Sequence, residues 1–247
     1  MEIRTVLISL MTIIVVGVIL LLVYELVFSS GIISRDPVLP VKSTVTLIDA
    51  LHRGTDYLKI DTKLPPSLNE EEGIEFSYAA SIVVNDYDWT SSAEVPIVFV
   101  KGAADLSSQS PSVTLKKGTN SLKITQDTYN PNGTPATPGI VTINNLPAAK
   151  MVSLVITVKQ KSMDVYVNGT LHTHLTLMAL PRQNTGSVLV GENGGWNGEI
   201  ANLVYFNYAL TPDEIRLLTN TKPFRNPNDV PPYGPYFNTN WWLSPVN

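Results

Sequence analysis

The chain has 247 residues, a net charge of −4, a pI of about 5.4 and no cysteine. Because no basic stripe is present to neutralise phosphates, the sequence argues against a nucleic-acid-binding protein. The absence of cysteine excludes disulfides, a thiol nucleophile and a thiolate metal site, and it favours a reducing compartment or a virus particle assembled in one.

The first predicted element is the uncharged segment 5–24, twenty residues long. As a helix rising roughly 1.5 Å per residue it would span about 30 Å, the hydrocarbon thickness of a bilayer. A cleaved signal peptide is the alternative, but its apolar core has about 7–15 residues and residues 28–31 form a poor cleavage site. We therefore predict a single-pass transmembrane anchor over residues 1–28. The positions taken to face lipid along it are Thr5, Leu10, Val15, Leu20 and Tyr24.

The orientation of this anchor stays open, because the positive residues on its two sides nearly balance. A juxtamembrane linker over residues 29–42 follows, stiffened by Pro37 and Pro40. From residue 43 to 222 the pattern changes to short β-type runs separated by turn residues. Strands are predicted at 44–48, 57–60, 74–85, 96–101, 112–116, 121–126, 139–143, 151–159, 163–167, 170–177, 187–190 and 199–206. Many short strands without alternating helices predict an all-β sandwich.

The clearest hairpin turns at Asn168-Gly169, the preferred two-residue type I′ loop. Around this turn apolar residues alternate with polar ones and Tyr166, so we expect one apolar and one polar sheet face.

A short helix is predicted from residue 211. Thr211 is the expected N-cap, Pro212 occupies the first helical position, and Glu214 completes a capping box. After it, residues 223–247 form a Pro- and aromatic-rich tail, suited to contacting a partner protein. Its proposed contact residues are Tyr233, Tyr236, Phe237, Trp241 and Trp242.

Five segments, in this order, resemble the laminin G-like branch of the concanavalin A-like lectin/glucanase superfamily. They are GTDYLKI at 54–60, IEFSYAA at 74–80, VYVNG at 165–169, WNGEI at 196–200 and YALTPDEI at 208–215. The resemblance covers about residues 43–220. It implies an all-β, concanavalin A-like (jelly-roll) β-sandwich with one short C-terminal helix, in which the first and last strands lie side by side.

Two departures from the family pattern are Ser81 and Met151, where the family often has Trp at a packing position. The segment 64–80 and the N-terminal anchor also resemble versions encoded by large DNA viruses of algae and protists. That likeness implies a location in the membrane or capsid of a virion.

Catalytic chemistry is not expected. Glucanases with this fold carry alternate carboxylates on one strand, as nucleophile and acid about 5 Å apart. Asp86 and Asp88 have that period but lack a third carboxylate. Together with Asn85 they could ligate Ca²⁺, although a turn with Asx hydrogen bonds is favoured. His172 and His174 could meet one metal ion, but a polar sheet face is the favoured interpretation, so no metal site or other cofactor is predicted.

Two sequons begin at Asn132 and Asn168, and the second coincides with the hairpin turn. Two loops offer aromatic side chains beside amide and carboxylate groups, the combination that glycan binding needs. The candidate carbohydrate-binding residues are Tyr87, Asp88, Trp89, Asn193 and Trp196. For Trp196 the family's packing role is favoured.

The sequence leaves three candidate functions open. The first is a non-catalytic, membrane-anchored structural or interaction protein, a minor capsid or membrane-associated virion component that contacts lipid and other proteins, capsid proteins among them. The second is a membrane-anchored lectin that binds a glycan. The third is a glycoside hydrolase with an unusual site.

Overall fold

A computed structural model describes residues 3–24, 41–70, 73–86, 95–116 and 118–221 of the chain. The chain divides into two compact units, residues 1–41 and 42–247. In the first unit, α1 (Ile3–Tyr24) is one continuous helix. The predicted tail and all but the last two residues of the predicted linker lie outside the described residues.

The described side chains of α1 are those of residue 7 and residues 9–24, and all of them are exposed. Within the part of the chain that the structure describes, no helix reaches the combined length and hydropathy of a membrane span. The helical conformation expected for the anchor is present, and its transmembrane role stays a prediction.

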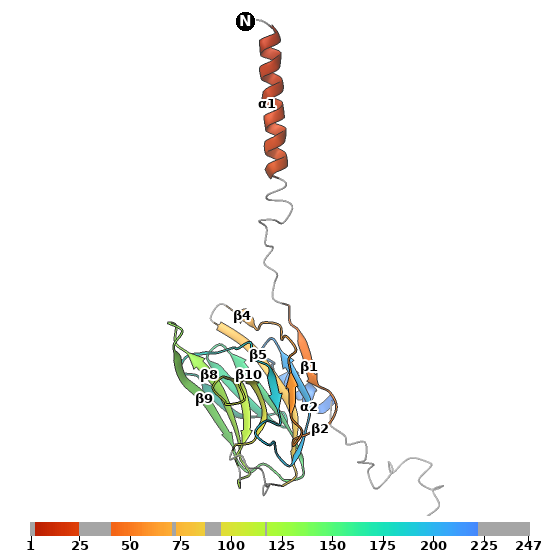
Figure 1. Ribbon diagram of the computed structural model, residues 1–247, viewed down its shortest axis with the longest axis vertical. Helices are drawn as coiled ribbons and strands as arrows, with labels where there is room; N and C mark the ends of the chain where they lie inside the picture. The colour runs from red at the N-terminus through yellow and green to blue at the C-terminus, as the bar shows by residue number, and fades with distance from the viewer. Residues whose placement is uncertain (1–2, 25–40, 71–72, 87–94, 117, 222–247) are drawn as a thin grey trace, which may run out of the picture. The chain divides into compact units, whose positions relative to one another are not determined.

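The second unit is a sandwich of two antiparallel sheets (Figure 1). The eight strands of the first sheet run in the order β1 (Thr44–Ile48), β15 (Gly198–Phe206), β5 (Gly73–Val84), β10 (Met151–Lys159), β11 (Ser162–Val167) and β12 (Thr170–Thr176), with β2 (His52–Arg53) on β15 and β4 (Leu68–Glu70) on β5. The second sheet has seven strands. Six run in the order β13 (Leu180–Pro181), β8 (Leu122–Tyr129), β7 (Gln109–Leu115), β6 (Ile97–Gly102), β14 (Val188–Val190) and β3 (Leu58–Ile60), and β9 (Pro135–Ile143) pairs with β8. This arrangement confirms the predicted jelly-roll sandwich.

Strand β5 illustrates how the sequence forms the core. Its large side chains alternate with small ones, so Phe76, Tyr78 and Ile82 point into the space between the sheets, while Ser77 and Ser81 occupy the other face. The facing strands of the second sheet supply residues such as Phe99, Val113 and Ile124 to the same core, and these side chains are at most 1% exposed.

A second, smaller core lies on the outer face of the first sheet. There α2 (Pro212–Thr221) packs its Ile215 against Val155, Tyr166 and Phe206. The predicted alternation around the hairpin is therefore corrected at Tyr166, which is buried because the helix covers it. Leu171, expected on the apolar face, is 48% exposed, and the register of β11 and β12 shifts between Val165 and Tyr166.

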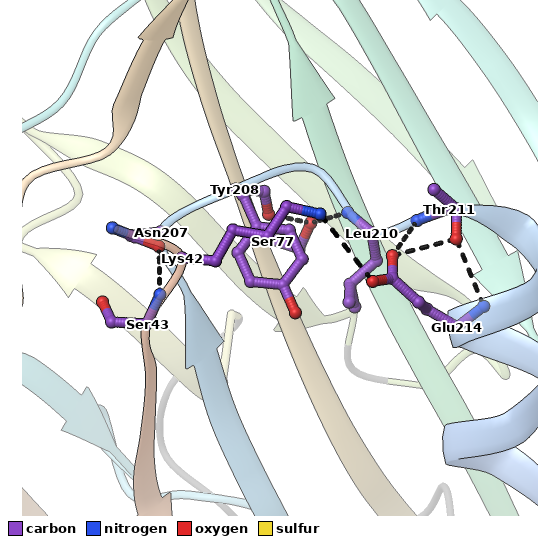
Figure 2. Close-up of polar contacts among 8 residues, drawn as sticks. All are labelled: Lys42, Ser43, Ser77, Asn207, Tyr208, Leu210, Thr211 and Glu214. Atoms are coloured by element: carbon purple, nitrogen blue, oxygen red, sulfur yellow. Dashed lines mark hydrogen bonds and ion pairs between the residues drawn. The ribbon is translucent and has the colours of Figure 1, made fainter. Parts of the chain in front are cut away.

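The two ends of the sandwich domain meet. Thr44 at the start of β1 pairs with Phe206 at the end of β15. The backbone N–H of Ser43 donates to Asn207 Oδ1 at 2.7 Å, and the Asn207 N–H donates to the Ser43 carbonyl at 3.2 Å. The side-by-side placement of the first and last strands is thus confirmed (Figure 2).

Further contacts fix the segment between β15 and α2. The buried Ser77 hydroxyl donates to the Tyr208 carbonyl and accepts from the Leu210 N–H, both at 2.9 Å. Thr211 caps α2, and Glu214 accepts from the Thr211 N–H at 2.7 Å, as the capping box predicts. Together with the contacts of Lys42 and Ser43, these interactions form what we call the terminal clasp (Figure 2).

Candidate binding cleft

A cleft of about 670 Å³ opens between the two sheets, and we call it the inter-sheet cleft. Two segments after short strands form its walls, residues 61–66 after β3 and residues 183–187 after β13. Strands of both sheets contribute the remaining lining residues, Tyr78, Lys101, Ser110 and Tyr205. Its volume lies within the range of roughly 300–1,000 Å³ that is typical of small-molecule sites.

The wall at 183–187 is held by side-chain amides. Asn184 Nδ2 donates to the Lys101 carbonyl at 2.8 Å, and Asn184 Oδ1 accepts from the Gly186 N–H at 3.0 Å. Gly186 has to be a glycine, because a Cβ there would lie 2.9 Å from the Gly102 Cα. This close approach brings the wall onto the end of β6.

The opposite wall is bonded to the first sheet and to the first wall. Tyr205 Oη donates to the Pro65 carbonyl at 3.0 Å, and Ser67 Oγ donates to Gln183 Oε1 at 2.8 Å. Asp61 accepts a hydrogen bond from the Ser187 hydroxyl and lies 3.1 Å from Lys59 Nζ. The two walls are therefore braced against each other before any ligand binds.

Burial and hydrogen bonding shift the pKa values of three groups beside the cleft. Desolvation raises the pKa of Tyr205 to about 12, against the opposing effect of its contact with Gln183. The pKa of Tyr78 is raised well above its ordinary value by burial, and both phenols are neutral at pH 7. The hydrogen bond from Ser187 and the contact with Lys59 lower the pKa of Asp61, so that carboxylate is charged.

A polar cluster extends behind Ser110. Its hydroxyl donates to the Arg182 carbonyl, and Gln126 Nε2 donates to the same carbonyl at 2.8 Å. Gln126 is fully buried, and its Oε1 has no hydrogen-bond partner among the described residues. Hydroxyl and amide groups thus lie where a sandwich core would ordinarily be apolar.

Of the residues predicted from sequence to bind a glycan, the two that the structure describes, Asn193 and Trp196, do not line the inter-sheet cleft. Trp196 is only 1% exposed; its ring packs over Gly54 and its Nε1 donates to the Val83 carbonyl at 3.0 Å. The candidate role of Trp196 in sugar stacking is therefore wrong, and the favoured packing role is confirmed. Asn193 is exposed, and Tyr87, Asp88 and Trp89 lie outside the described residues.

The two histidines considered as metal ligands, His172 and His174, contact other polar side chains. His172 Nδ1 lies 2.8 Å from Thr173 Oγ1, and His174 Nδ1 lies 2.5 Å from Asp164 Oδ1. Among the described residues, no group of three or more His, Asp or Glu side chains could hold a metal ion. Asp86 is exposed and Asp88 is outside the described part, so the calcium alternative stays a prediction.

Sequence reasoning missed the inter-sheet cleft. Its residues come from segments more than a hundred positions apart, and no local motif links them. One signal was present in the sequence: Lys101 directly follows the four apolar residues Ile97 to Val100 within a predicted strand.

The comparisons with known proteins agree with this fold. A laminin G family model, described as "Concanavalin A-like lectin/glucanases superfamily", matches residues 53–216, so the chain belongs to that superfamily. No curated protein matches the chain by sequence.

Among solved structures, the chain resembles the binding domain of botulinum neurotoxin serotype D, with 12% identity and a TM-score of 0.51 over 74% of this chain and 46% of that one. The receptor-binding domain of botulinum neurotoxin D gives the same identity and TM-score over 74% and 48%. This chain thus spans about half the length of those domains, and at such identity the likeness shows the fold alone.

Proposed function

We propose that the protein is a non-catalytic binding module that recognises a glycan in the inter-sheet cleft and is carried by a membrane anchor. The observation that carries the proposal is the lining of the cleft. Asp61, Ser110, Gln183 and Asn184, whose side chains can form hydrogen bonds, line a preformed space large enough for one or two sugar rings.

Membership in a superfamily described as lectins and glucanases supports a saccharide ligand. The receptor-binding role of the neurotoxin domain is a property of that protein, and it is compatible with binding here. Hydrolysis by the usual retaining mechanism needs two carboxyl groups about 5–5.5 Å apart. The described lining of the cleft includes one, Asp61, and this favours binding without catalysis.

A glycan array probed with the full-length chain in a mild detergent tests the proposal. We expect a discrete set of bound glycans, and Asn184→Ala should weaken binding at least tenfold because Asn184 holds the wall at residues 183–187. Asn193→Ala is the matched control in the exposed loop and should leave binding unchanged. A flat array, on which no glycan is bound above background, would contradict the glycan proposal.

For the membrane, the proposal is that α1 is a single-pass anchor in contact with lipid. The exposed apolar side chains along it, among them Leu10, Val15 and Leu20, support this. In cells, the full chain should stay with membranes after an alkaline wash, and Val15→Arg should release it, because a charge at mid-membrane costs about 2.5–3.5 kcal/mol or more. Release of the unaltered chain by the wash would contradict an anchor.

A second candidate function is docking to another protein, such as a capsid protein in the membrane-associated layer of a virion. A hollow of about 220 Å³ beside α2 favours it; apolar residues there include Met151, Phe206 and Leu218. The small Ser81 lies in this hollow, where the family often has Trp. Ser81→Trp should fill the hollow and block incorporation into particles without changing glycan binding. Normal incorporation of that variant would count against this surface.

A further inference from the structure

Lys101 is a buried lysine in the lining of the inter-sheet cleft. It is 8% exposed, and the four residues before it on β6 are apolar and buried. Desolvation lowers its pKa from the ordinary value of 10.5. Lysine is rarely buried to this degree unless its charge is paired.

The partners of Lys101 leave most of its binding capacity unused. An ammonium group has three donors, and the structure gives this one a single hydrogen bond, to the Gly186 carbonyl. In the described part of the chain, no carboxylate lies within 4.0 Å of its Nζ. The carboxylate in the lining, Asp61, is already paired with Lys59 and bonded to Ser187.

The charges of the cleft therefore sum to a positive value. Lys101 contributes one uncompensated charge on the floor, and the exposed Lys63 adds a second at the same cleft. A buried, unpaired ammonium is costly. A ligand that brings a negative group to Lys101 would offset this cost and form a charge-assisted hydrogen bond in a site shielded from water.

We propose that Lys101 is the anion-recognition residue of the cleft and that the glycan bound there carries a carboxylate, as in a uronic-acid residue. This rests on the proposed glycan function. The carboxylate pairs with Lys101, and the sugar hydroxyls bond to Ser110, Gln183 and Asn184. A phosphate or sulfate group suits the site less well, because the described lining holds no arginine and no helix N-terminus.

The test uses the full-length chain on an array in which each uronate-bearing glycan stands beside its neutral methyl ester. We expect the acid to bind at least tenfold more tightly than the ester, and Lys101→Gln to abolish the difference. Lys63→Gln is the matched control: it removes one positive charge from the same cleft at an exposed position, and should reduce the preference for the acid by less than threefold.

A titration of the unaltered chain with glucuronate and with methyl glucuronate, followed by NMR of the Asn184, Gly186 and Ser187 amides, needs no variant and so avoids misfolding. Equal binding of acid and ester overturns the role of Lys101 but leaves the glycan function standing. A flat array with saturable shifts from glucuronate but not from its methyl ester overturns the recognition of a longer glycan and supports the anion site. A flat array without such shifts overturns both.

Discussion

The terminal clasp makes a quantitative prediction at Ser77. Its side chain is fully buried, and its Oγ bonds both the Tyr208 carbonyl and the Leu210 N–H at 2.9 Å. Ser77→Ala removes the hydroxyl that makes both bonds and leaves these two backbone groups without it. Each such group costs about 1–3 kcal/mol when buried, so we expect the free energy of unfolding to fall by about 2–6 kcal/mol.

For a domain of this size, a loss of 1 kcal/mol lowers the melting temperature by roughly 2–4 °C, so the expected drop is about 4–24 °C. Urea denaturation and calorimetry of the full chain measure both quantities. Ser81→Ala is the matched control on the same face of β5, because no hydrogen bond is described for its hydroxyl, and it should change stability by less than about 0.5 kcal/mol. Equal effects of the two substitutions would refute the role of Ser77 in the clasp.

Three other predictions concern packing and pH. Trp196→Phe should lower the free energy of unfolding by about 2–4 kcal/mol, since it removes the hydrogen bond to the Val83 carbonyl and reduces the buried volume. Glycan affinity should not change, and lost affinity in a stably folded variant would return Trp196 to the binding site. Burial raises the pKa of Glu214, but the hydrogen bonds from Thr211 and the charge of Lys42 outweigh this effect, so the pKa lies below 4.5. The unaltered protein should therefore be more stable than Glu214→Gln by a constant amount above pH 4.5, and this difference should vanish as pH falls through the lowered pKa. A difference that grows on acidification would contradict the lowered pKa. Burial raises the pKa of Tyr205 to about 12, so the stability that the neutral phenol contributes is full below pH 10 and is lost as pH rises through 12. Ultraviolet titration should show Tyr205 ionising after the exposed tyrosines, and Tyr205→Phe should remove one late ionisation step from the titration curve.

The sequence predicted those elements whose residues interact locally. The strand predicted at 74–85, the Asn168-Gly169 turn and the capping box of α2 each depend on neighbours within a few positions, and all three are present. Asn168 and Gly169 adopt φ values of 49° and 77°, as a type I′ turn requires.

Strands β2, β4 and β13 were not predicted. Each has two or three residues, too few for a period to be visible, and each exists because a longer strand offers it backbone partners. Leu68 in β4, for example, pairs with Glu75 of β5. Pairing across the fold therefore created these strands without a local pattern.

The binding site was even harder to predict from local sequence patterns than the short strands were. Reasoning from exposed aromatics selected Trp196, but whether a Trp stacks on a sugar or fills the core depends on Gly54, which lies far from it in sequence. Lys101 was assigned to a strand without a role, because only the folded walls at residues 61–66 and 183–187 enclose it.

The central claim is that a glycan binds in the inter-sheet cleft. Hydrogen–deuterium exchange of the full chain tests it most directly, measured with and without a glycan that the array has identified as a ligand. We expect the glycan to slow exchange in the segments that form or adjoin the inter-sheet cleft, residues 61–67, 101–110 and 183–187. Protection confined to residues 85–89 and 192–197 would contradict it and restore the site predicted from the aromatic loops.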